Sequence, residues 1–112
     1  MENYRQPNLF DEDIIETAEV LLYALGEFQS RGKLLADREL ALDRLRGAFK
    51  RAAEKFGTEE LSDEEIAQGL EKLNAKVVKV PNFVAKHPFR VTINDELAEK
   101  SKLTYQAHLK ND

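Results

Sequence analysis

The sequence of 112 residues contains no cysteine, and this absence removes several kinds of chemistry at once. Disulfide bridges, thiol nucleophiles and zinc sites with cysteine ligands are excluded, so histidine and carboxylates are the only possible metal ligands. Apolar runs that approach the roughly 20 residues of a membrane-spanning helix are also missing. The N-terminal residues MENYRQPNLF have neither the basic nor the apolar region of a secretory signal. We therefore expect a cytoplasmic protein that has no membrane partner.

Catalytic motifs are missing as well. The sequence has no HExxH pattern, no glycine-rich phosphate loop and no serine nucleophile elbow. Its acidic clusters, 11-DED-13 and 63-DEE-65, stand at expected helix starts, where carboxylates are favoured by the helix dipole. We therefore expect no catalytic site, no cofactor and no metal. The remaining enzymatic alternative would use His87, because its imidazole titrates near neutral pH in a loop before Pro88.

The composition fits one soluble globular domain. Hydrophobic residues make up 42% of the chain and charged residues 34%. A chain of this length buries roughly two-thirds of its unfolded surface in a single core, so a second autonomous core is not expected. We predict one domain over residues 1–112, with a loose N-terminus at 1–9 and a frayed C-terminus at 110–112.

Two long stretches repeat apolar residues at alternating spacings of three and four, which is typical of amphipathic helices. The first opens at Phe10 and Asp11, where the aspartate can cap the helix, and ends near Ser30. The second is expected to run from a cap at Asp37 to Phe56. Because a short connection joins them, the two helices should form an antiparallel hairpin.

A third helix has the clearest start signal in the chain. Ser62 and Glu65 have the spacing of a capping box, in which each side chain binds the backbone N–H of the other residue. This helix is expected to stop at Asn74, which tolerates a left-handed conformation. A final helix should run from Asp95, after a cap at Asn94, to about residue 109.

Between the last two helices, the sequence 76-KVVKVPNFVAKHPFRVTI-93 predicts a β-hairpin. Alternation suggests that Val78 and Val80 face one way and Lys79 the other, while Pro81 and Pro88 limit the strands to short edge positions. The fold class is therefore α+β and mostly helical, with three helices, a hairpin at about 76–93 and a C-terminal helix. This order resembles the outline of a winged helix-turn-helix domain.

Charge is strongly segregated along the chain although the net charge is only −4. Successive blocks carry −5 (1–37), +3 (38–57), −6 (58–71), +5 (72–93) and −1 (94–112). Opposite blocks can simply neutralise one another inside the fold, or they can guide docking to a partner. The basic hairpin supplies the candidate binding residues, which are Lys79, Phe83, Lys86, His87 and Arg90.

Two functions from different classes compete. The first is a non-enzymatic protein-interaction module, which binds a protein partner or a second copy of itself through the segregated charged faces. The alternative is a nucleic-acid-binding protein that uses the basic hairpin, with lysine and arginine on phosphates and phenylalanine stacked on bases. The acidic start of the third helix argues against the alternative, because a helix-turn-helix places that end in the major groove between rows of phosphates.

Overall fold

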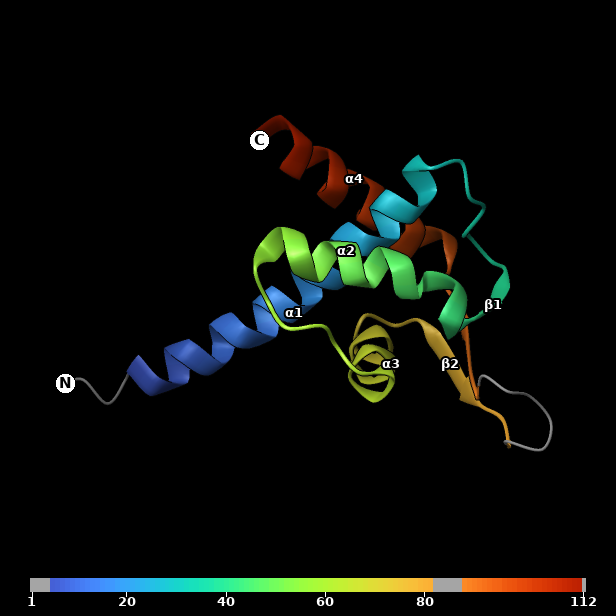
Figure 1. Cartoon of the computed structure of the whole chain (residues 1–112), viewed down its shortest axis with the longest axis horizontal. Helices are drawn as coiled ribbons and strands as arrows, with labels where there is room; N and C mark the ends of the chain where they lie inside the picture. The colour runs from blue at the N-terminus through green and yellow to red at the C-terminus, as the bar shows by residue number, and fades with distance from the viewer. Residues whose placement is uncertain (1–4, 82–87, 112) are drawn as a thin grey trace.

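The structure, a computed structural model, describes residues 5–81 and 88–111, with the side chains of the first helix described from Thr17 onward. In chain order, the elements are α1 (Arg5–Ser30), β1 (Glu39–Ala41), the 3-10 helix η2 (Leu42–Leu45), α2 (Arg46–Phe56), α3 (Asp63–Lys72), β2 (Lys76–Lys79), β3 (Phe89–Thr92) and α4 (Asp95–Asn111). The described residues thus hold four α-helices beside a three-stranded antiparallel sheet (Figure 1). The predicted α+β class and the winged-helix-like outline are confirmed.

The core lies where α1 meets the other three α-helices and the inner face of the sheet. Its largest fully buried apolar side chains come from α1, η2, α3, β3 and the residue after β3: Leu21, Leu25, Leu45, Ile66, Leu70, Val91 and Ile93. Contacts Tyr23–Phe56 and Glu27–Arg51 show that α1 and α2 run antiparallel, as predicted. Each of the four helices therefore contributes to one shared core.

The first helix begins earlier than predicted, at Arg5 instead of Phe10. Pro7 falls in its first turn, where proline is tolerated because the missing N–H would have no intrahelical partner. The extra turn and a half makes α1 the longest element of the molecule, with 26 residues.

The predicted start of the second helix at Asp37 is wrong, because residues 39–45 form β1 and η2 and the α-helix begins only at Arg46. Asp37 adopts a positive φ of 59° and its N–H donates to the carbonyl of Ile93 at 2.7 Å. Leu40 then pairs with Val91 of β3. Residues 39–41 thus pair with a strand that lies about 50 residues later in the sequence. This pairing makes them a strand, although the spacing of their leucines suits a helix equally well.

The sheet order is β1-β3-β2, so β3 is central and only β1 and β2 are edges. Leu40, Val91 and Val77 stand in one cross-strand row on the core face. Val78, whose register partner is Arg90, therefore faces outward with 38% of its surface exposed, and Lys79 lies on the opposite face. A shift of one residue in register turns every side chain of a strand to the opposite face.

The predicted end signals of α3 and the start signal of α4 are confirmed. The Ser62 hydroxyl accepts from the Glu65 N–H at 3.1 Å, and the Ser62 N–H donates to the Glu65 carboxylate at 2.8 Å. Asn74, which follows the C-cap residue Leu73 of α3, has a left-handed φ of 73°. Asn94 caps α4 by accepting the Leu97 N–H at 2.7 Å. These short-range hydrogen bonds fix both helix boundaries.

Candidate interaction surfaces

The basic residues of the hairpin lie on opposite faces of the sheet. Lys79 is the register partner of Phe89, and its ammonium lies 5.5 Å from the centre of that ring on the core side. Arg90, the next residue, therefore points to the other side, where its guanidinium lies 3.8 Å from the Glu39 carboxylate. The other three candidate binding residues lie outside the described part of the chain: Phe83, Lys86 and His87. Their binding role stays a prediction.

Lys79 faces acidic residues of α3. A groove of about 270 Å³ separates α3 from β2 and β3, and its α3 wall includes Glu64, Gln68 and Glu71. All three are exposed, so the outward face of α3 is acidic. In a winged helix-turn-helix this helix would approach DNA, where its carboxylates would meet phosphates. The groove thus holds Lys79 beside the carboxylates of Glu64 and Glu71.

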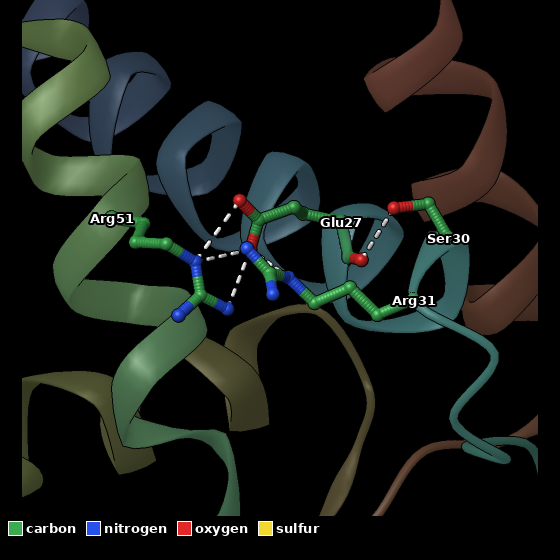
Figure 2. A network of polar contacts seen from close by, with 4 residues as sticks. All are labelled: Glu27, Ser30, Arg31 and Arg51. Atoms are coloured by element: carbon green, nitrogen blue, oxygen red, sulfur yellow. Dashed lines mark hydrogen bonds and ion pairs between the residues drawn. The ribbon is translucent and has the colours of Figure 1, made fainter.

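The basic residues of α2 are largely engaged within the chain. The Arg51 Nε donates to both carboxylate oxygens of Glu27, at 2.9 and 3.1 Å, and Nη2 lies 2.8 Å from Oε1 (Figure 2). Arg31 approaches the same carboxylate at 3.7 Å. The hydrogen bond that Arg51 donates to the Glu27 carboxylate raises the pKa of Arg51, and the charges of Glu27 and Glu54 add to this effect. This ion pair ties α1 to α2.

A second ion pair also joins blocks of opposite charge. The Arg46 guanidinium of α2 binds both oxygens of Asp63 at the start of α3, at 2.8 and 3.0 Å. The Arg90–Glu39 pair joins the hairpin to β1, but both of these residues belong to blocks of net positive charge. Much of the charge segregation seen in the sequence is thus compensated between elements of the fold. The charged faces left for a partner are smaller than the sequence blocks suggest.

The longest helix contact is an antiparallel seam between α1 and α4. Each successive contact lies three or four residues earlier on α1 and three or four residues later on α4. These contacts are Gln29–Ala98, Gly26–Ser101, Tyr23–Tyr105 and Glu19–His108. At the centre, a Cβ on Gly26 would meet the Ser101 carbonyl oxygen and the Tyr105 Cβ. Gly26 therefore allows the two backbones to approach closely.

Aromatic rings close the far end of this seam. Tyr23 makes edge contacts with Phe56, Tyr105 and His108, at centroid distances of 5.4, 5.0 and 5.7 Å. The His108 Nε2 lies 2.7 Å from the Glu19 carboxylate. This cluster packs three helices together, since Phe56 comes from α2. It accounts for His108 as a structural residue of the seam.

Beyond this cluster, the first turns of α1 project from the rest of the molecule. Of the seam contacts above, Glu19–His108 lies nearest the N-terminus of α1, and the helix continues from Glu19 back to Arg5. Figure 1 shows this blue segment reaching beyond every other labelled element. The projecting sequence, RQPNLFDEDII, carries four large apolar residues: Leu9, Phe10, Ile14 and Ile15.

The C-terminal half of α4 exposes two leucines: Leu103 lies on the side away from the seam, and Leu109 lies at the edge of the seam, four residues after Tyr105. Leu103 is 58% exposed and Leu109 is 49% exposed. With Gln106 they follow each other at intervals of three residues, which forms one ridge on the helix surface. Lys102 and Lys110 stand next to the two leucines in sequence and are also exposed. This ridge and the projecting turns of α1 form the candidate interaction surface.

A small groove continues this surface at the base of the projecting turns. It has a volume of about 200 Å³ and lies between α1 and α3. Its apolar wall includes Ala18, Leu61 and Leu73. The described apolar surface of α1 thus reaches Ala18, at the base of the projecting turns.

Metal sites and membrane-spanning helices are two further features that the structure addresses. Within residues 5–81 and 88–111, no group of three or more histidine and acidic side chains is arranged to hold a metal ion. In the same part of the chain, no helix combines the length and the apolar character that crossing a membrane requires.

The sequence also contained a pattern that indicates the apolar surface of α1, although the basic residues of the hairpin were its more prominent feature. Phe10 and Ile14 continue the four-residue spacing that leads to Ala18 and the buried Leu21. The stripe therefore continues in the sequence into the turns of α1 that project beyond the other labelled elements in Figure 1. No family model, curated protein or solved structure matches this chain.

Proposed function

We propose that the chain is a non-enzymatic protein-interaction module that works as a homodimer. The observation that carries this proposal is the projection of α1 past the end of α4 with four large apolar residues in its sequence. Fully burying such side chains contributes about 1.5–3 kcal/mol each. Large apolar patches on the surface of a soluble protein mark interaction sites. A partner that covers the projecting turns would supply this energy.

The proposal moves the interface from the charged hairpin to the helical end of the molecule. Charged blocks neutralise one another through pairs such as Glu27–Arg51 and Arg46–Asp63, and Lys79 faces the acidic side of α3. These features also make nucleic acid the weaker alternative, because the basic residues lie on opposite faces of the sheet or form ion pairs within the chain. The cytoplasm stays the predicted location, in keeping with the cysteine-free sequence.

Sedimentation equilibrium over low to high micromolar concentrations tests this proposal. The chain has a mass of 12.8 kDa, and we expect twice this mass as the concentration rises. Ile14→Asp should return the protein to a monomer, because a charge in the interface would be desolvated. Val78→Asp is the matched control: Val78 is exposed on the outer face of the sheet, and its replacement should leave the dimer intact. A monomer at every wild-type concentration would refute the homodimer.

A further inference from the structure

We propose that the open edge of β2 binds an extended segment of a partner protein, which adds to the three-stranded sheet as a further strand. The segment carries apolar side chains on the face toward α3 and acidic side chains on the opposite face. This binding goes beyond the proposed homodimer and does not depend on it. In Figure 1, β2 and the N-terminus of α1 lie at opposite ends of the molecule.

The pairing of β2 with β3 determines which backbone groups of β2 point to the open edge. In an antiparallel pair, successive residues of one strand alternately bond to the partner strand and point away from it. The Val80 N–H donates to the carbonyl of Pro88 at 2.7 Å, so Val80 and Val78 bond toward β3. Val77 and Lys79 therefore direct their N–H and C=O groups outward.

These outward groups of Val77 and Lys79 have no partner in the described part of the chain. On its N-terminal side the edge is closed, because the Ala75 N–H donates to the carbonyl of Leu70 in α3 at 2.9 Å. Unpaired backbone groups on an edge strand are a template for a further strand, and extended peptides bind proteins in this way. The other edge suits a peptide less well, since β1 has three residues and passes directly into η2.

A groove beside this edge can receive side chains of the added strand. It has a volume of about 270 Å³ and separates α3 from β2 and β3. Ala67 and Phe89 give it apolar surface, and its charged lining is acidic overall, with Glu64 and Glu71 against Lys79. Every second side chain of a strand points to the same face, so alternate residues of the segment enter the groove. These residues are apolar, because the groove disfavours further acidic groups.

Charge on the outer face of β2 indicates the other side chains of the segment. Lys76 is exposed and, as the residue before Val77, points to the outer face. Residues 72–81 contain three lysines and no acidic residue. An acidic side chain opposite Lys76 on the added strand would form a favourable cross-strand pair. A second copy of β2 would instead bring two strands of like charge together, which is unfavourable.

NMR titration of the isotope-labelled protein tests the proposal with a synthetic peptide of alternating valine and glutamate. We expect the amide signals of Val77 and Lys79 to shift and both amides to exchange more slowly in the complex. A matched peptide of alternating valine and lysine should bind about tenfold more weakly or less at low ionic strength. No shift at these two amides with millimolar peptide would overturn the proposal. Equal or tighter binding of the lysine peptide would overturn the acidic partner.

Removal of single N–H groups distinguishes strand addition from a general attraction between charges. Only every second N–H of the peptide faces β2, so N-methylation at one alternate set of positions should weaken binding about tenfold, and methylation at the other set should have little effect. In the protein, Lys79→Pro removes an outward N–H that the β2–β3 ladder does not use, and proline is tolerated on edge strands. Lys79→Ala is the matched control, because it keeps the N–H and should bind about tenfold more tightly than Lys79→Pro.

The outcomes separate this proposal from the homodimer. If methylation at either set of positions has the same effect on binding to the wild-type protein, strand addition is overturned, whether or not Lys79→Pro folds. Equal binding of the peptide by a folded Lys79→Pro and by Lys79→Ala would overturn it as well. If Val77 and Lys79 become protected at high protein concentration without peptide, the added strand belongs to a second copy, and the proposed partner is wrong. Sedimentation of the wild type decides the homodimer independently of each of these results.

Discussion

Gly26 is the residue at which the seam between α1 and α4 is most sensitive to a single added atom. Gly26→Ala would place a methyl group against the Ser101 carbonyl and the Tyr105 Cβ, and neither is the flexible end of a side chain. We expect a loss of about 1–3 kcal/mol in the free energy of unfolding, in spite of the better helix propensity of alanine. Urea denaturation followed by circular dichroism measures this loss.

Gly47→Ala is the matched control for this prediction. Gly47 also lies in a helix, but a Cβ there would approach only Nη1 of Arg51, at 3.3 Å, which is the end of a long side chain. Its replacement should be neutral or stabilise the protein by up to about 1 kcal/mol. Equal effects of the two substitutions would show that Gly26 does not set the distance between α1 and α4.

At the scale of the element, the capping box at Ser62 should determine how firmly α3 begins. Ser62→Ala removes the hydroxyl that accepts the Glu65 N–H, and we expect a cost of about 0.5–2 kcal/mol in the free energy of unfolding. Ser30→Ala is the control, because the exposed Ser30 hydroxyl donates only to a carbonyl of its own helix, that of Glu27, and should cost less than about 0.5 kcal/mol. A wild-type denaturation midpoint for Ser62→Ala would contradict the capping role.

The sequence predicted those elements whose ends depend on neighbouring residues. Ser62, Asn74 and Asn94 act within a few residues of their own positions, so their signals can be recognised in the sequence. β1 could not be predicted in this way, because Leu40 becomes a strand residue only by pairing with Val91. The orientation of Lys79 depends on the same sheet register. Interactions between distant segments determine both the formation of β1 and the orientation of Lys79.

At the scale of the whole molecule, the candidate site differs from the prediction made from the sequence more than the fold does. The sequence directed attention to a basic hairpin, yet Lys79 and Arg90 lie on opposite faces of the sheet. The apolar stripe of α1 was visible in the sequence, but the projection of the first turns of α1 beyond the other labelled elements is seen only in the structure (Figure 1). A surface that arises because one packed helix is longer than another cannot be recognised in any short stretch of the sequence. The structure was needed to find it.

Hydrogen exchange of the backbone amides in residues 5–16 tests most directly whether the projecting turns of α1 form the interface. We expect slow exchange in this segment at high protein concentration and faster exchange on dilution, because the dimer protects amides that the monomer exposes. Exchange in α3, at residues 63–72, should stay the same at both concentrations. Equal and fast exchange of residues 5–16 at every concentration would contradict the proposed interface.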